Sequence, residues 1–387
     1  MYKPIIPEEI LQFVETIKKF VKKECEPIDD LIEEQGKIPE EVVEKCRQLG
    51  LFGMTIPEEY GGLGIGALGY CLVAKALSWA HPAFRSLITV NNCLGSQPLL
   101  LAGTEEQKRK YLPDIASGKK MTAFCLTEPG AGSDASAIST TAVKDGKHWV
   151  INGLKHFITN GPFADIYIVL ALTDKEKRAR GGITAFIVEK GAPGLKIGRI
   201  HQHMGSKTSI QSEVIFEDLR VPEENVLGEV GEGFRIAMKT LDIGRLNLAA
   251  SCIGFAQKLL EMGREYALLR KQFGKPIAEF QAIQWMLADS ATEIYAAESM
   301  LIDACLRYDA GEREPALASM VKLYASEMAC RVVDRVLQIH GGMGYMVETK
   351  VERYYRELRL FKIIEGTSEI QRLVIARRLL RGNLSFE

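Results

Sequence analysis

The chain has 387 residues, of which 47% are hydrophobic and 26% are charged, as in an ordinary soluble globular protein. These proportions exclude a disordered, collagen-like or coiled-coil chain, and at roughly 150 residues per domain the length predicts two or three domains. The net charge of −1 gives no basic surface for nucleic acid or an anionic membrane. The first residues lack a signal-peptide core, and no apolar run approaches the roughly 18 residues of a membrane span. We therefore expect a cytoplasmic protein without a membrane span.

The spacing of cysteine and histidine argues against a metal centre. The eight cysteines are scattered and form no CxxC pair, so we predict buried free thiols rather than a disulfide framework or a zinc site. His201 and His203 would share one face of a strand, but no nearby cysteine or third histidine completes a ligand set. We predict polar surface residues there and no bound metal.

Residues 1–120 are predicted to form an α-helical domain. Ile10, Val14 and Ile17 recur at three- and four-residue steps, which places one apolar stripe on a helix. Residues 68–80 are apolar on nearly every side, as in a buried helix. Thr104 followed by Gln107 predicts the start of another helix through a capping box.

Residues 121–229 are predicted to form a β-domain, a barrel or a sandwich, because short β-rich runs alternate with turns. Asn152-Gly153 predicts a hairpin between two of these runs. No helices alternate with the strands, which excludes a doubly wound nucleotide fold. Over residues 230–387 the helical period returns, with long helices expected at 279–309 and 312–337. We predict a four-helix bundle there, and the α+β class for the whole chain.

Three motifs could carry chemistry, and each has an ordinary structural alternative. Gly64, Gly66 and Gly69 match GxGxxG, but no strand precedes them, so we predict a loop between helices rather than a dinucleotide site. Residues 124–134 lead a strand into a glycine-rich stretch that could approach an anion or could simply turn. Residues 361–371 place Glu365 after two isoleucines. Desolvation there would raise its pKa and suit a general base, but the motif alone favours a cap or surface glutamate.

Three further segments are ambiguous by themselves. Arg270 begins a short basic loop that could be a helix C-cap. Gln338 begins a glycine-rich break between helices. Asp242 and Arg245 stand three apart on a predicted helix, where a local ion pair is the simplest interpretation.

The order and spacing of these segments are more specific than any one of them. LTEPGAGSD, ITNG, RKQFGKPI, QIHGGMGY and IIEGTSEIQRLVIAR together resemble the acyl-CoA dehydrogenase family over essentially the whole chain. The resemblance implies an N-terminal α-domain, a middle β-domain and a C-terminal four-helix bundle. It also implies a homotetramer, arranged as a dimer of dimers, with FAD at each active site. Electrons from an acyl-CoA substrate would pass to an electron-transferring flavoprotein.

The resemblance also implies a role for particular residues. FAD would be bound within one subunit by Phe124, Leu126, Thr127, Gly132, Ser133, Phe157, Thr159, Thr367 and Glu369. A neighbouring subunit would contribute Arg270, Gln272, Phe273, Gln338, Gly341 and Gly342. Glu365 matches the catalytic base, which removes the α-proton while the flavin takes the β-hydride. One branch of the family places the base on the helix of Arg245, where this chain has Gly244.

Substrate contacts are implied for Arg85, Ser86, Ser133, Asp242, Arg245 and Gly366. Arg85-Ser86 resembles glutaryl-CoA dehydrogenases, in which the arginine holds the distal carboxylate, a contact that a guanidinium makes well. Decarboxylating members carry Glu and Tyr where this chain has Ser78 and Ile364. We therefore expect conversion of glutaryl-CoA to glutaconyl-CoA without decarboxylation. The alternatives are a short- or medium-chain acyl-CoA dehydrogenase, an acyl-CoA oxidase, and a non-catalytic CoA- or partner-binding scaffold.

Overall fold

The computed structural model describes residues 6–205, 208–382 and 384, and it begins with a helical region. Its helices are α1 (Glu8–Phe20), the π-helical η1 (Val21–Cys25), α2 (Asp29–Gln35), α3 (Glu40–Gln48), α4 (Gly66–Leu77), α5 (Ala83–Thr89), the π-helical η4 (Val90–Gly95), α6 (Ser96–Ala102) and α7 (Glu105–Ala116). The predicted helices are therefore present in this region.

Local signals explain where these helices begin and which face they bury. On α1, Val14, Ile17 and Phe20 are buried, as the apolar stripe predicts. The Thr104 and Gln107 side chains each accept from the other's backbone N–H, at 3.2 and 3.1 Å, so α7 begins with the predicted capping box. The GxGxxG stretch follows a short 3₁₀ turn and leads into α4, with no strand before it. Gly64 lies in the predicted loop, but Gly66 and Gly69 already belong to α4.

The middle region is one eight-stranded sheet. Its strands are β1 (Thr122–Cys125), β2 (Thr141–Asp145), β3 (His148–Thr159), β4 (Ile166–Leu172), β5 (Ile183–Glu189), β6 (Leu195–Ile200), β7 (Gln211–Pro222) and β8 (Val226–Leu227). They follow the order β6-β7-β3-β2-β4-β5-β8, and β1 pairs in parallel with β4. Every residue of β4 is buried, because alternate side chains enter two different apolar cores.

The hairpin predicted at Asn152-Gly153 is wrong. The chain runs straight through this dipeptide within β3, and the turn lies earlier, at Gly146 between β2 and β3. A β-bulge interrupts the pairing of β3 with β7 between Ile151 and Gly153. A Cβ atom at Gly153 would collide with Thr140, so close packing rather than a turn requires this glycine.

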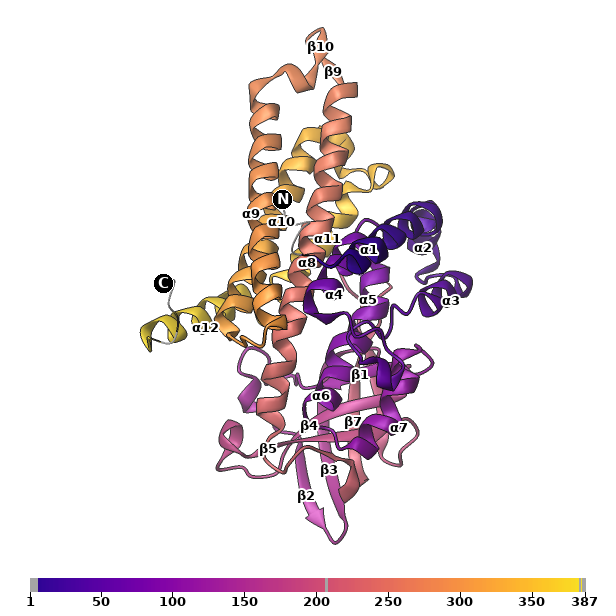
Figure 1. The fold of residues 1–387 in the computed structure, drawn as a ribbon, viewed down its shortest axis with the longest axis vertical. Coiled ribbons are helices and arrows are strands. Elements are labelled where there is room, and N and C mark those ends of the chain that lie inside the picture. The colour runs from indigo at the N-terminus through magenta and orange to yellow at the C-terminus, as the bar shows by residue number, and fades with distance from the viewer. Residues whose placement is uncertain (1–5, 206–207, 383, 385–387) are drawn as a thin grey trace.

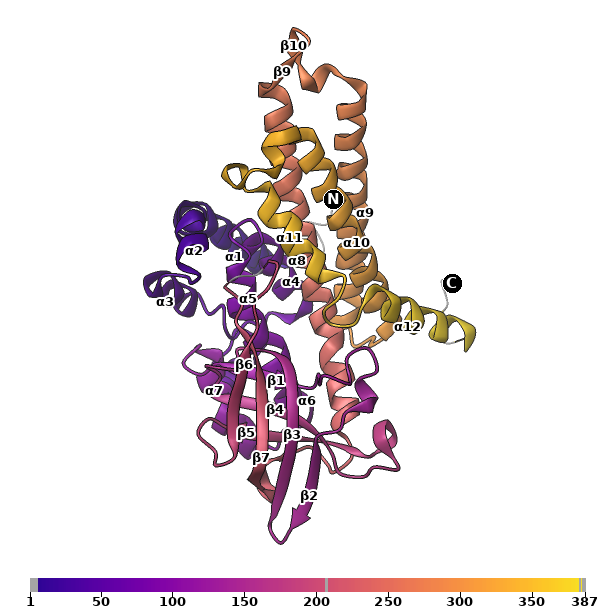
Figure 2. The same ribbon diagram turned by 180° about the vertical axis from the view of Figure 1, so that it is seen from behind.

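The C-terminal region is a bundle of long helices. It contains α8 (Gly233–Leu269), α9 (Gln281–Asp309), α10 (Pro315–His340), α11 (Val351–Phe361) and α12 (Ser368–Leu380), with the small hairpin β9 (Lys271–Gln272) and β10 (Lys275–Pro276) between α8 and α9. Figures 1 and 2 show the hairpin at one end of the bundle and the sheet beyond the other. The predicted α+β class, with a β-region between two helical regions, is confirmed.

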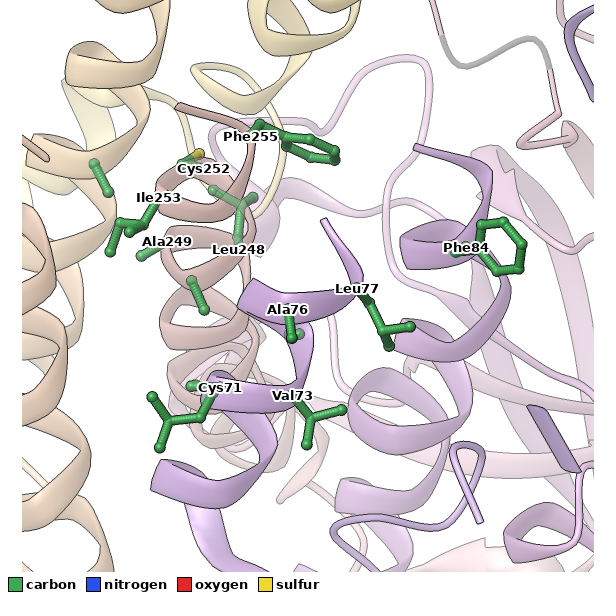
Figure 3. Packing of buried hydrophobic residues seen from close by; sticks show 14 of the residues in the cluster. Cys71, Val73, Ala76, Leu77, Phe84, Leu248, Ala249, Cys252, Ile253 and Phe255 are labelled. Carbon is green, nitrogen blue, oxygen red and sulfur yellow. The ribbon is translucent and has the colours of Figure 1, made fainter. Parts of the chain in front are cut away.

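A shared apolar core joins the first helical region to the bundle. Figure 3 shows side chains of α4 lying close to side chains of α8, such as Leu248 and Cys252, with Phe84 of α5 nearby. A Cβ atom at Gly254 of α8 would strike the Lys75 carbonyl of α4, so the two helices cross in close contact. In the described part of the chain, no helix is both long and apolar enough to cross a membrane.

Candidate active site

Glu365 lies in the short connection between α11 and α12. Its backbone is left-handed, with φ of 55°, and that of Gly366 follows with φ of 93°. Thr367 then caps α12 by accepting a hydrogen bond from the Ile370 N–H at 3.3 Å. The predicted turn before a new helix is therefore present. The Glu365 side chain is only 9% exposed, so the turn directs it inward.

The walls around Glu365 differ from those that the sequence predicted. Ile363 is half exposed, whereas Ile364 is partly buried and packs against the apolar core. A Cβ atom at Gly244 of α8 would meet both Glu365 Oε2 and Cys93 Sγ. Arg85 Nη2 lies 3.7 Å from Glu365 Oε1. Groups of α8, η4 and α5 thus enclose the carboxylate, and the predicted shielding by Ile363 is wrong.

This environment changes the acidity of Glu365. Burial raises its pKa above the ordinary value, and the positive charges of Arg85, Lys322 and Arg245 only partly oppose that rise. Oε2 is buried and accepts no hydrogen bond from the described residues. A desolvated carboxylate with raised proton affinity has the chemistry of a general base.

Arg85 points into the protein, which contradicts the alternative of an arginine at the surface. It lies on α5 directly after the buried Phe84, and its side chain is 11% exposed. Its guanidinium carbon is 4.8 Å from the centroid of the Phe361 ring. Its Nε is buried without a hydrogen-bond partner among the described residues. Ser86, the next residue of α5, is partly buried.

Asp242 and Arg245 form the predicted local ion pair on α8, with Arg245 Nη1 3.0 Å from Asp242 Oδ1. Arg245 Nε also donates to the Glu365 carbonyl oxygen at 3.4 Å. Burial raises the pKa of Asp242 to about 6, even though Arg245 and Arg313 act against the rise. The pair is therefore connected to the Glu365 turn.

The structure brings two of the predicted flavin segments together. After β1 ends at Cys125, Lys155 Nζ donates to the Leu126 carbonyl at 3.0 Å, and the His156 N–H donates to the Thr127 carbonyl at 2.8 Å. The segment from Phe124 to Ser133 therefore lies beside β3 where it reaches Phe157 and Thr159. Phe124 and Thr127 are partly buried, while Gly132 and Ser133 are exposed.

A buried ion pair, which we did not predict from the sequence, supports this loop. Lys155 Nζ lies 2.7 Å from Glu128 Oε1, and both side chains are almost completely buried. Glu128 also accepts from the Ser139 and Thr140 N–H groups, at 2.6 and 3.0 Å. Burial opposes ionisation of Glu128, but Lys155 and these donors lower its pKa to about 2. The sequence did offer one indication of a buried ion pair, because Lys155 stands at an inward position of β3.

Phe157 is presented to the outside by an unusual backbone. Its φ is 57° and its side chain is 55% exposed. The rings of His156 and His201 pack against it, with centroids 4.0 and 5.0 Å away. His201 is therefore partly buried in a ring cluster rather than a plain surface residue. Among the residues described, no cluster of three or more His, Cys, Asp or Glu side chains could hold a metal ion.

Six predicted flavin residues lie away from this region of the same chain. They are all exposed: Arg270, Gln272, Phe273, Gln338, Gly341 and Gly342. The first three lie in or beside the β9–β10 hairpin at one end of the bundle (Figure 1), and the other three lie in the last turn of α10 or directly after it. The ends of α8 and α10 meet there, because the rings of Tyr266 and His340 stack with centroids 4.2 Å apart. The remaining two, Thr367 and Glu369, lie at the start of α12 beside the Glu365 turn.

Comparison with known proteins agrees with this arrangement. Three family models match the chain: acyl-CoA dehydrogenase N-terminal domain over residues 7–119, middle domain over 123–219 and C-terminal domain over 231–380. The chain belongs to the acyl-CoA dehydrogenase family. It is accordingly an FAD-dependent acyl-CoA dehydrogenase.

Three proteins that are similar to this acyl-CoA dehydrogenase carry different substrate names. Subunit CarC of the caffeyl-CoA reductase-Etf complex of Acetobacterium woodii is 45% identical over 94% of this chain and 96% of its own. The structure of butyryl-CoA dehydrogenase from Megasphaera elsdenii is 39% identical, covers 97% and 99%, and has a TM-score of 0.93. The structure of the glutaryl-coenzyme A dehydrogenase glutaryl-CoA complex is 34% identical, covers 98% and 96%, and has a TM-score of 0.91.

The loop after β1 fits FAD. Cβ atoms built at Gly130 and Gly132 meet no atom within 4 Å, so the backbone there is open to close approach by a ligand. Phe157 offers an exposed ring beside the same loop. FAD, when bound, accepts the hydride of the oxidation. The residues of this chain hold the loop, and they keep the Glu365 carboxylate buried.

Proposed function

We propose that this acyl-CoA dehydrogenase oxidises a short acyl-CoA thioester whose far end carries a carboxylate, with glutaryl-CoA converted to glutaconyl-CoA. The observation that carries this proposal is the buried Arg85 guanidinium, 3.7 Å from Glu365 Oε1. A cation kept out of water is costly unless an anion accompanies it. An acyl chain that places its α-carbon at Glu365 would bring a distal carboxylate toward Arg85.

In this proposal Glu365 is the base. It takes the proton from the α-carbon next to the thioester carbonyl as the bond to the β-carbon becomes a double bond. Burial supports the role, because it raises the pKa of the carboxyl and strengthens the base. We further propose that Asp242, Arg245 and Gly366 contact the thioester side of the substrate, and that Ser86 and Ser133 lie along its path.

Retention of the distal carboxylate is supported by the residues at two positions, Ser78 and Ile364. The hydroxyl of Ser78, which stands where decarboxylating relatives have Glu, donates to its own helix at the Ala74 carbonyl, 2.8 Å away. Ile364 can form no hydrogen bond through its side chain. A guanidinium paired with the substrate carboxylate stabilises that anion more than neutral carbon dioxide, which disfavours loss of the carboxyl group.

A second candidate is a monocarboxylic short acyl-CoA such as butyryl-CoA. The names of the relatives favour it, because the butyryl-CoA dehydrogenase structure is more similar to this chain than the glutaryl-CoA complex.

The CarC relative belongs to a complex with an electron-transferring flavoprotein. That name supports our proposal of such a flavoprotein as the electron partner.

We also propose that the protein assembles as a homotetramer. Phe273, at the tip of the β9–β10 hairpin, is 92% exposed. An aromatic side chain so fully exposed beside Arg270 and Gln272 suits contact with a neighbouring subunit and its flavin. This arrangement would complete each flavin site from two chains.

Turnover of a small acyl-CoA panel tests the function. Purified holoenzyme is given glutaryl-, butyryl-, valeryl- and hexanoyl-CoA with an artificial electron acceptor, and products are identified by mass. We expect the highest kcat/KM for glutaryl-CoA, with glutaconyl-CoA as product. A crotonyl-CoA product would contradict retention of the carboxylate, and a preference for butyryl-CoA would favour the second candidate. Hydrogen peroxide formed at the same rate in air would identify an oxidase.

A further inference from the structure

The turn that carries Glu365 is strained in isolation. Glu365 and Gly366 both have left-handed backbones, a conformation that a non-glycine residue adopts only when its surroundings impose it. Such strain is common where a functional side chain must be held in one direction. The groups that hold this turn therefore matter for where the carboxylate lies.

Side chains from three helices hold the two carbonyl groups of the turn. Lys322 Nζ of α10 donates to the Gly366 carbonyl at 2.8 Å. Gln371 Nε2 of α12 contacts both carbonyls, 2.8 Å from that of Gly366 and 3.1 Å from that of Glu365. Arg245 of α8 contacts the Glu365 carbonyl.

Lys322 is an unusual member of this set, because its side chain is fully buried. Burial lowers its pKa, since the charged ammonium loses its water. The Gly366 carbonyl replaces part of that hydration. The Lys322 charge also lowers the pKa of Glu365, second among the charges to Arg85. A buried lysine here affects both the geometry and the acidity of the carboxylate.

We propose that Lys322 and Gln371 are positioning residues for the base, which they aim by clamping the Glu365–Gly366 main chain. This inference rests on the proposed role of Glu365. Neither side chain is assigned to the substrate or the flavin. A reacting group displaced by about 1 Å loses on the order of 100-fold in rate, so loss of the clamp should lower kcat more than it weakens substrate binding.

The two residues differ in charge, which separates their effects. Glu365 is faced by three cations, Arg85 of α5, Arg245 of α8 and Lys322 of α10. The titratable groups around them on α4, η4 and α8 have pKa values that burial raises, so they stay neutral near pH 7: Tyr70, Cys93 and Cys252. Removing Lys322 should therefore raise the pKa of Glu365. Removing the uncharged Gln371 should leave the pKa of Glu365 unchanged.

Three variants of the FAD-loaded enzyme test the clamp with butyryl-CoA and glutaryl-CoA. In Lys322→Met we expect kcat to fall by about 100-fold, with acyl-CoA binding changed by less than about threefold. The acid limb of its kcat/KM profile should move to higher pH. Gln371→Met should lower kcat about tenfold without moving that limb, and Lys322→Arg should recover part of the rate.

Lys258→Met is the matched control. Lys258 is also a largely buried lysine that donates to a backbone carbonyl, that of Trp79, but it lies away from Glu365. Its loss should lower thermal stability and leave kcat unchanged. If Lys322→Met and Gln371→Met both keep kcat within about twofold and the same pH profile, the clamp is wrong.

Glu365→Gln, assayed in parallel, separates this inference from the proposed function. Near-normal turnover by that variant would remove Glu365 as the base and the clamp with it. An inactive Glu365→Gln beside fully active Lys322→Met and Gln371→Met would overturn the clamp alone. If Lys322→Met does not fold, Gln371→Met decides the question by its kcat and unmoved acid limb.

Discussion

Arg85 Nη2 and Glu365 Oε1 lie 3.7 Å apart, although the two residues come from α5 and from the turn before α12. The proposed substrate-selecting cation and the proposed base are therefore neighbours in one buried site. A substrate carboxylate bound to Arg85 would partly neutralise one of the positive charges that lower the pKa of Glu365.

Arg85→Met should affect substrates selectively. Leaving a substrate carboxylate unpaired costs roughly 2–5 kcal/mol, so kcat/KM for glutaryl-CoA should fall by a factor on the order of 30 or more. The value for butyryl-CoA should fall much less or rise. Steady-state kinetics on both substrates measures this ratio. An equal loss on both would place Arg85 in a structural role.

Glu365→Gln should abolish dehydrogenation and leave acyl-CoA binding largely intact. The amide keeps the shape of the side chain and loses its basicity, which removes a rate factor of roughly 100 to 10,000. In the wild-type enzyme, kcat/KM should fall as pH drops through the raised pKa of Glu365, because the base must be unprotonated. Flavin bleaching by substrate in stopped flow follows the step directly. Persistent bleaching in the variant would identify another base.

Gly244→Ala should displace the base without unfolding the protein. The new methyl group would meet Glu365 Oε2, the free end of a side chain that can move aside. We expect kcat to fall by about 100-fold, with the midpoint of thermal unfolding little changed. Gly263→Ala is the control on the same helix, since its methyl would meet only the apolar side chains of Val336 and Leu287. Equal activity of the two variants would contradict the prediction.

Glu128→Gln should weaken FAD retention. The change leaves the Lys155 ammonium buried without its anion, at a cost of roughly 3–5 kcal/mol. In the wild-type protein, ionised Glu128 stabilises the folded state. This stabilisation is present above the ordinary glutamate pKa of 4.5, and it is lost as the pH falls toward about 2, the pKa of Glu128 in the folded protein. Bound flavin absorbance after gel filtration reports the loss. Glu217→Gln, which breaks the exposed pair with Lys196, is the control.

Much of the fold could be predicted because its signals are local. The stripe on α1 and the Thr104–Gln107 capping box act within a few residues, and both helices formed as expected. Gly153 shows the limit of such reasoning. Asn-Gly is a strong hairpin signal, but here the glycine is needed for close contact with Thr140, the residue before β2.

Some residues of the candidate site could be predicted from the sequence, and others could not. Glu365 and Arg85 were found because whole motifs resemble a family. The expected shielding of Glu365 by Ile363 was wrong, since Ile363 is half exposed. Lys322 precedes the carbonyl that it holds by 44 residues. Nothing near it in the sequence indicates that contact, because it exists only once α10 packs against the end of α11.

Helix α8 spans 37 residues, about 55 Å at 1.5 Å per residue. It carries Gly244 and Arg245 near Glu365. Its C-terminal end, roughly 37 Å further along, leads into residues 270–276, which we call the Arg270 loop. Under the proposed assembly, two differently inactivated chains could rescue each other. A mixed oligomer of a Glu365→Gln chain and a chain with a defective Arg270 loop would contain one site with both parts intact. Activity would then return when two inactive proteins are refolded together.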